Sequence, residues 1–140
     1  MTKFQFANTI ILFLISSMFF SCKINHSDIK AEKFSWYYKT RKIHRVLIDT
    51  RPVDVYEKGH IPEAVNIPIS EIEFKKKLKS KLPKNATDVW IIFVYAQDES
   101  STRKVKKQLT KIYKRHFPFK GPTALFYIEG GYQKWLEVEK

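Results

Sequence analysis

Thiol chemistry in this sequence could come from a single residue. The 140 residues include one cysteine, Cys22, which ends an apolar run near the N-terminus. One cysteine excludes an intramolecular disulfide, a CxxC redox pair and a zinc site built from several thiolates. The four histidines, at positions 26, 44, 60 and 116, lack the spacing of metal ligands, so we expect no metal and no cofactor.

A polar run near the middle of the chain is the second place where chemistry could occur. It follows Ala96 and consists of Gln97, Asp98, Glu99, Ser100, Ser101 and Thr102. A hydroxyl in this run could act as a nucleophile if a base lay beside it, and His60 is the candidate base. The backbone N–H groups of the run could instead bind an oxyanion at the start of the next helix. We favour a structural role, because Ser and Thr at such positions usually cap the helix and the two acids oppose an anion.

Short apolar strands and amphipathic helices alternate along the chain and must position these residues. Strands are predicted at 46–49, 65–67, 89–95 and 123–128, and helices at 53–58, 70–81, 101–116 and 132–138. The aromatic segment 34–38 fits either a short strand or a helix. Segment 89–95 is wholly β-branched or aromatic, which is typical of a central strand buried on both faces. The pattern predicts a single α/β domain with a mostly parallel central sheet flanked by helices on both faces.

The first 22 residues have the features of an export signal. Lys3 is followed by an apolar run, 10–20, that is too short to span a bilayer. The Ser21-Cys22 junction resembles a bacterial lipobox, in which the cysteine receives the lipid and becomes the mature N-terminus. We therefore expect a signal peptide at 1–21, a lipid on Cys22, a tether at 22–33 and a folded domain at 34–140. Such a lipoprotein lies in the bacterial cell envelope and faces the periplasm or the exterior; an uncleaved membrane anchor and plain secretion are the alternatives.

Two separate motifs give the folded region a family resemblance. Residues 46–68 resemble the N-terminal signature of rhodanese-like domains, and residues 127–135 resemble their C-terminal signature. The matching positions include Asp49, Arg51, Gly59, His60 and Pro62 in the first motif, and Gly130, Gly131 and Trp135 in the second. We assign these residues to architecture. A carboxylate and a guanidinium two residues apart can fix a tight turn, glycine suits a helix end, and the histidine ring can bind loop carbonyls.

The resemblance also implies which residue is missing. Active rhodaneses carry a cysteine directly after the central strand, and its thiolate accepts sulfane sulfur as a persulfide. In this chain that position is Ala96, the usual loop glycine is Glu99 and the usual arginine is Ser101. We therefore expect no catalytic residue for sulfur transfer and predict a catalytically inactive domain that serves as a binding or scaffold module. An enzyme with altered chemistry on the same pocket, acting on a non-thiol anion or an ester, is the alternative.

The chain carries a large excess of positive charge. It has 26 Lys and Arg against 14 Asp and Glu, a formal net charge of +12. Many of the basic residues fall in segments 75–84 and 103–120, where they alternate with core positions of predicted helices. A solvated helix exterior explains them, and attraction to an anionic surface is the second interpretation. The expected partners are the membrane, through the lipid anchor, and an unidentified envelope protein or an anionic surface. Nucleic acid is not expected, because no exposed aromatic residues accompany the basic clusters.

Overall fold

The described part of the chain folds around a five-stranded parallel sheet. The computed structural model describes residues 25–40, 45–69, 74–81, 90–112 and 123–140. The strands are β1 (Asn25–Ile29), β2 (Arg45–Asp49), β3 (Val65–Asn66), β4 (Trp90–Tyr95) and β5 (Thr123–Ile128). They lie in the order β1-β5-β4-β2-β3, and each neighbouring pair is parallel. The predicted parallel α/β fold is therefore confirmed, with β4 in the middle of the sheet.

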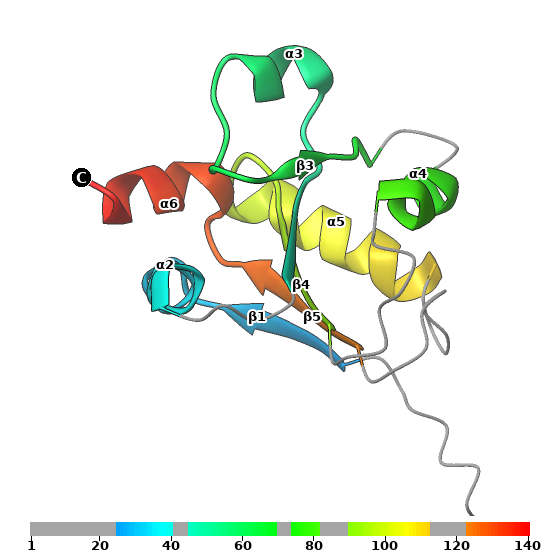
Figure 1. Ribbon diagram of the computed structural model, residues 1–140, viewed down its shortest axis with the longest axis horizontal. Helices are drawn as coiled ribbons and strands as arrows, with labels where there is room; N and C mark the ends of the chain where they lie inside the picture. The colour runs from blue at the N-terminus through cyan, green and yellow to red at the C-terminus, as the bar shows by residue number, and fades with distance from the viewer. Residues whose placement is uncertain (1–24, 41–44, 70–73, 82–89, 113–122) are drawn as a thin grey trace, which may run out of the picture.

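Helices cover both faces of this sheet. They are α2 (Ala31–Thr40), α3 (Val53–Glu57), α4 (Phe74–Lys81), α5 (Glu99–Ile112) and α6 (Gly131–Val138). α2 and α6 lie side by side on one face, α4 and α5 cover the other, and α3 projects beyond the end of β2 (Figure 1). Alternate residues of β4 divide the core in the same way. Ile92 and Val94 pack towards α4 and α5, whereas Phe93 and Tyr95 pack towards α2 and α6, so this strand is buried on both faces as predicted.

The prediction of a polar tether at 22–33 is wrong for most of its length. Residues 25–29 form β1, which pairs with β5 from Asn25↔Ala124 to Ile29↔Ile128. The strand lacks a clear sequence signal because it lies at the sheet edge, where backbone hydrogen bonds hold it while most of its side chains meet solvent. α2 follows at once with Ala31 and Phe34 buried, so segment 34–38 is helical and the domain begins by residue 25.

Other element boundaries differ from prediction by a few residues, as helix and strand ends commonly do. α5 begins at Glu99 rather than near residue 101, and α4 is described from Phe74 onwards. The predicted signal peptide, Cys22, and the predicted helical residues 70–73 and 113–116 lie outside the described residues. Within the described ranges, no helix is both long enough and apolar enough to cross a bilayer.

Candidate functional site

The residues of both sequence motifs meet at the carboxyl end of the sheet, where β2, β4 and β5 finish. Asp49 ends β2, and the chain bends at Arg51 before α3. Arg51 Nη2 lies 2.6 Å from Asp49 Oδ2, and its Nε donates to both carboxylate oxygens at 3.0 and 3.1 Å. The backbone N–H of Arg51 also donates to Asp49 Oδ1 at 2.9 Å. Both side chains are buried, at 3% and 0% exposure, so this ion pair fixes the turn from inside the protein.

Arg51 also links this turn to its neighbours. Its Nη1 donates to Gln97 Oε1 at 3.0 Å, and its Nη2 donates to the carbonyl of Gly59 at 2.7 Å. The guanidinium carbon lies 4.0 Å from the centroid of the Tyr132 ring. Burial alone would lower the pKa of Arg51, but the hydrogen bonds and the charge of Asp49 outweigh it and raise that pKa. Arg51 therefore remains a cation whose donors are directed at protein groups.

Ala96 occupies the position directly after β4 and is buried, at 4% exposure. Its backbone N–H donates to Thr102 Oγ1 at 3.2 Å, and its carbonyl accepts from the N–H of Tyr132 at 2.9 Å. The next carbonyl, that of Gln97, accepts from the N–H of Gln133 at 3.0 Å. The start of α6 thus holds residues 96 and 97 in place. The side chain at position 96, directly after β4, is a methyl group.

Two glycines at the start of α6, its N-cap Gly130 and its first residue Gly131, permit that close approach. Gly130 and Gly131 both have positive φ, at 75° and 62°. A Cβ on Gly131 would lie 2.5 Å from the carbonyl oxygen of Ala96 and 2.9 Å from the backbone nitrogen of Asp98. Gly131 is therefore required both by its own conformation and by the backbone it touches.

Asp98 closes the N-terminus of α5 with its own carboxylate. The N–H of Ser101 donates to Asp98 Oδ1 at 2.8 Å, and the N–H of Asp98 donates to Ser101 Oγ at 3.0 Å. This reciprocal pair is a capping box. Hydrogen bonds from the backbone and the hydroxyl of Ser101 hold the pKa of Asp98 below its ordinary value. The N-cap is thus Asp98 rather than one of the hydroxyl residues, and a carboxylate already accepts a donor that an external anion would need.

Glu99 and Thr102 are likewise hydrogen-bonded within the protein. Glu99 Oε2 accepts from the N–H of Gly130 at 2.5 Å, and its Oε1 accepts from Arg103 Nε at 2.7 Å. Thr102 is buried and bonded to Ala96, whereas Ser100 is exposed. The guanidinium of Arg103 is therefore bound to Glu99 and does not face the loop, where it could have bound an oxyanion.

His60 lies apart from these hydroxyls. Its Nδ1 is 3.1 Å from the carbonyl of Tyr56, and its ring stacks on that of Tyr56 with 3.9 Å between centroids. Among the described residues, no hydrogen bond joins His60 to a hydroxyl of segment 100–102. The nucleophile and base required by the alternative enzyme hypothesis are therefore not in contact.

The remaining motif residues serve packing and loop structure. The Pro62 carbonyl accepts from the Tyr38 hydroxyl at 2.9 Å, and Trp135 stacks on Tyr132 with 5.7 Å between ring centroids. Within the described ranges, no cluster of three or more His, Cys, Asp or Glu side chains is arranged to hold a metal ion.

Two aromatic residues of the site were missed by the sequence interpretation. The Tyr95 hydroxyl accepts from the N–H of Ile61 at 3.1 Å, and burial together with a hydrogen bond to Asp49 raises the pKa of Tyr95. Tyr132 covers the guanidinium of Arg51, and its hydroxyl lies where a side chain on Gly59 would begin, 2.9 Å from an ideal Cβ. The place of Tyr132 directly after the Gly-Gly pair was the available signal.

Comparison with known proteins agrees with this geometry. Residues 33–138 match the family described as "Rhodanese-like domain". The chain is 30% identical over 115 residues to Adenylyltransferase and sulfurtransferase UBA4 of Saccharomyces cerevisiae. The match covers 78% of this chain but only 24% of the length of UBA4. It is 25% identical over 126 residues to the uncharacterized protein YqhL of Bacillus subtilis, covering 89% of this chain and 83% of YqhL.

A solved structure shows the same fold at lower identity. Ygr203w, a yeast protein tyrosine phosphatase of the rhodanese family, superimposes with a TM-score of 0.63 at 16% identity, covering 81% of this chain and 86% of that one. The match to the family over 33–138, the parallel sheet and the meeting of both motifs at Arg51 lead to one conclusion: the chain belongs to the family of rhodanese-like domains.

Proposed function

We propose that the protein is a catalytically inactive rhodanese-like domain that acts as a binding or scaffold module of the bacterial cell envelope. The observation that carries this proposal is Ala96, a buried methyl group at the position where an active domain has its cysteine. Sulfur transfer requires a thiolate that can form and release a persulfide, and a methyl group has no lone pair to offer. Cys22, the only cysteine of the chain, lies before the folded domain.

The loop after β4 adds a second obstacle. In an active domain its N–H groups stabilise an anionic sulfur species, whereas here Asp98 places a carboxylate on the N-terminus of α5. An anionic substrate approaching this loop would meet both an occupied donor and a like charge. The sulfurtransferase and phosphatase activities in the names of two relatives are therefore not proposed for this chain.

The envelope location rests on the sequence before the domain. Ser21 and Cys22 follow a short apolar run, as in a bacterial lipobox, and we propose a lipid on Cys22. Intact-mass measurement of protein extracted from membranes tests this. The expected species starts at Cys22 and carries the added mass of acyl chains; a species that retains Met1 would overturn the proposal.

An assay of thiosulfate–cyanide sulfur transfer tests the absence of activity. The full chain and a Cys22→Ser variant are measured side by side, so that any sulfur chemistry at Cys22 is removed in the second. We expect both to remain at the background rate. Turnover above background that survives Cys22→Ser would refute the inactive assignment.

A further inference from the structure

We propose that the end of the domain formed by the amino ends of the strands and the C-terminal half of α5 lies on anionic phospholipid headgroups, with the loop after β4 turned away from the membrane. This orientation rests on the lipid anchor proposed above. It follows from three features of the described residues: where the first strand begins, which way the strands and α5 run, and how charge is distributed along α5.

The first feature is the short connection to the anchor. Because β1 begins at Asn25, only Lys23 and Ile24 separate the folded domain from Cys22. Three residue steps of extended chain span at most about 10 Å. A lipid held in the bilayer at Cys22 would therefore keep the start of β1 at the headgroups, a restriction that the twelve-residue tether expected from sequence would not impose.

The second feature is the common direction of the strands. β1, β4 and β5 are parallel neighbours, so the start of β1 marks the edge at which β4 and β5 also begin. α5 follows β4 and returns towards the start of β5, which brings its C-terminal end to that same edge. Figure 1 shows the end of α5 and the start of β1 on one side of the molecule, with α3 and the end of β2 away from them.

The third feature is the distribution of charge along α5. Glu99 and Glu129 lie at its N-terminal end and line a pocket that extends along α5 as far as Lys107 and Lys111. Arg103 and Lys106 are neutralised, by Glu99 at 2.7 Å and by Asp28 at 2.6 Å. Lys104, the other cation of this half, is exposed, and its charge is one of the causes that lower the pKa of Asp98. With the nearby carboxylates of Asp98, Glu99 and Glu129, the helix therefore begins in a region where positive charge is balanced.

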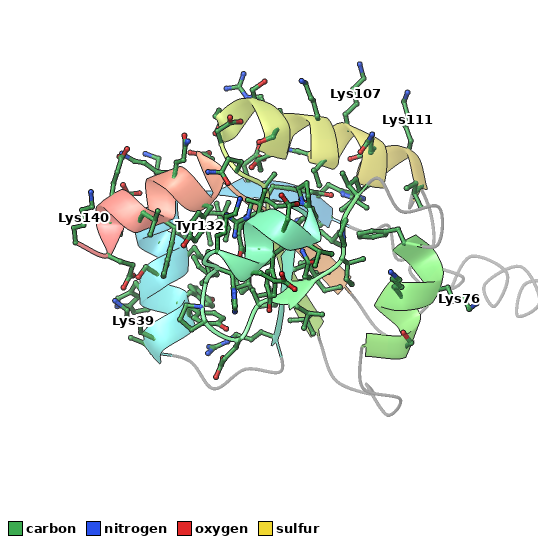
Figure 2. All side chains as sticks on the ribbon, turned by 90° about the horizontal axis from the view of Figure 1, so that it is seen from above. Lys39, Lys76, Lys107, Lys111, Tyr132 and Lys140 are labelled. Atoms are coloured by element: carbon green, nitrogen blue, oxygen red, sulfur yellow. The ribbon has the colours of Figure 1, made fainter. Side chains whose placement is uncertain are left out.

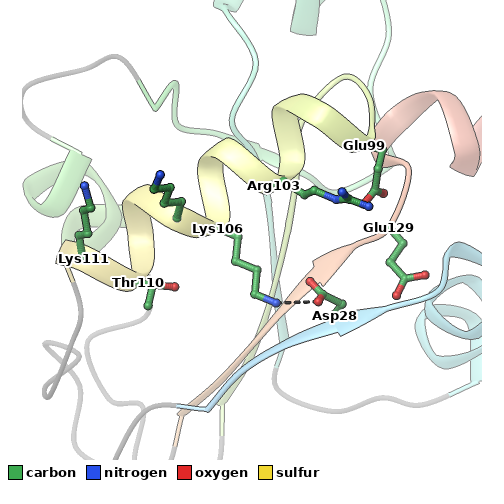
Figure 3. Close-up of a pocket in the computed structure, with 8 residues that line it drawn as sticks. Asp28, Glu99, Arg103, Lys106, Thr110, Lys111 and Glu129 are labelled. Carbon is green, nitrogen blue, oxygen red and sulfur yellow. Dashed lines mark hydrogen bonds and ion pairs between the residues drawn. The ribbon is translucent and has the colours of Figure 1, made fainter.

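Lys107 and Lys111, in the second half of the helix, are different. Both are exposed, and within the described ranges neither forms an ion pair. Figure 2 shows both side chains extending outwards from α5, and Figure 3 shows Lys111 directed away from the ion pair between Lys106 and Asp28. Flexible, solvated lysines near an anchored end suit the diffuse negative potential of a lipid surface.

The orientation has a consequence for the proposed binding role. The turns after β2 and β4 and the start of α6 lie at the opposite end of the strands from the start of β1. These residues would remain open to a partner that approaches from the aqueous side of the membrane. Only the amino ends of the strands and the C-terminal half of α5 would contact the headgroups.

The test measures which end of the anchored protein meets the bilayer. The lipidated full chain carries one introduced thiol, Gln108→Cys on α5 or Asp54→Cys on α3, each at an exposed position and labelled with a fluorophore. It is reconstituted into vesicles of phosphatidylcholine with about one third phosphatidylglycerol, some of whose headgroups carry a quencher. We expect strong quenching at position 108 and little at position 54. Equal quenching at the two positions would overturn the proposal.

A matched pair of variants tests the charge contribution. Lys107→Gln/Lys111→Gln is expected to lower quenching at position 108 by about twofold or more, and vesicles of phosphatidylcholine alone should give the same loss. Lys58→Gln/Lys140→Gln removes the same charge from exposed positions elsewhere and should leave quenching unchanged. An equal effect of the two variants would contradict a role for the basic end of α5.

The intact mass of each reconstituted sample separates the two proposals. A sample without acyl chains shows that the anchor itself is wrong. A lipidated sample with equal quenching at both positions shows that the anchor is right and the orientation is wrong.

Discussion

The guanidinium of Arg51 lies against the ring of Tyr132, with its central carbon 4.0 Å from the ring centroid. Arg51 belongs to the first sequence motif and Tyr132 to the second, so the two motifs meet at this contact. Because Arg51 also binds Asp49 and Gln97, one buried cation joins the turns after β2 and β4 to the start of α6. The motif residues thus have a structural role that does not depend on a thiol at position 96.

Loss of the Arg51 cation should be costly. Arg51→Met keeps much of the side-chain volume but leaves Asp49 buried without a counter-charge, and we expect the free energy of unfolding to fall by about 3–5 kcal/mol. Urea unfolding at pH 7 measures it. Arg103→Met is the matched control, because it removes an exposed ion pair, and it should have little effect. Equal losses in the two variants would contradict the structural role of Arg51.

The first strand should contribute to stability although its sequence resembles a tether. Ile29 ends β1 and is 7% exposed among residues of α2, β4 and β5. Ile29→Ala should therefore lower the free energy of unfolding by about 2–4 kcal/mol, as deletion of a buried side chain does. Lys33→Ala, at an exposed position of α2, is the control. A negligible effect of Ile29→Ala in denaturant unfolding would show that residues 25–29 are not part of the folded unit.

The central strand and the first strand differ in how far the sequence alone could predict them. β4 is apolar on both faces, so the run of β-branched and aromatic residues at 89–95 identifies a central strand without further information. β1 is held mainly by backbone hydrogen bonds at an edge, and such bonds leave no mark in side-chain periodicity. The sequence alone therefore does not reveal β1, which is recognised by its pairing with β5 in the folded structure.

The site was predictable to a similar degree. A two-residue spacing of Asp49 and Arg51 suffices to indicate a paired turn, and the structure contains that pair. The stacking of Tyr132 on Arg51 depends on where α6 begins relative to β2, which no local pattern specifies. The same holds for Glu99, whose bond to the N–H of Gly130 joins segments 31 residues apart.

Gly130 and Gly131, at the start of α6, should differ in their tolerance of substitution. Both have positive φ, so each alanine variant is strained. A Cβ on Gly130 would lie 2.4 Å from Cβ of Lys134, in the first turn of the same helix, so a local adjustment of that turn would relieve the clash. A Cβ on Gly131 would meet the backbone of Ala96 and Asp98 in another segment, and that clash could be relieved only by moving α6 away from the loop after β4. We expect Gly131→Ala to be the more destabilising variant, by about 1–3 kcal/mol beyond Gly130→Ala. Thermal and urea unfolding of the two variants in parallel would reveal the order, and the reverse order would contradict the close approach.

Asp98 should make stability depend on pH in the acid range. Its pKa is lower in the folded protein than in the unfolded chain, because the Ser101 backbone and hydroxyl bind the carboxylate. A depressed pKa stabilises the fold above the unfolded pKa, and that stabilisation is lost as pH falls below about 4 towards the folded value. We therefore expect the free energy of unfolding of the wild type to decline more steeply below pH 4 than that of Asp98→Asn.

Other acids also contribute to this decline, so the comparison must isolate Asp98. Hydrogen bonds from Lys134 lower the pKa of Glu137, and those from Lys39 and Ser35 lower the pKa of Glu139. Both groups are unchanged in Asp98→Asn, and their effect cancels in the difference between the two proteins. Identical pH profiles for wild type and variant between pH 5 and about 2.5 would show that the carboxylate of Asp98 does not cap α5.

A thiol introduced at position 96 would report the electrostatics of the loop after β4. In Ala96→Cys, made with Cys22→Ser to remove the other thiol, the N-terminus of α5 favours the thiolate while the carboxylate of Asp98 opposes it. Adding Asp98→Asn should therefore lower the pKa of the new thiol by about 0.5–1 unit. The pH dependence of its alkylation by iodoacetamide gives this pKa directly. Glu137→Gln is the control, because it removes the same charge from an exposed position on α6 and should leave the thiol unchanged. A pKa unmoved by Asp98→Asn would mean that the carboxylate does not act on the position where sulfur chemistry would occur, and that the missing thiol alone accounts for the inactivity proposed.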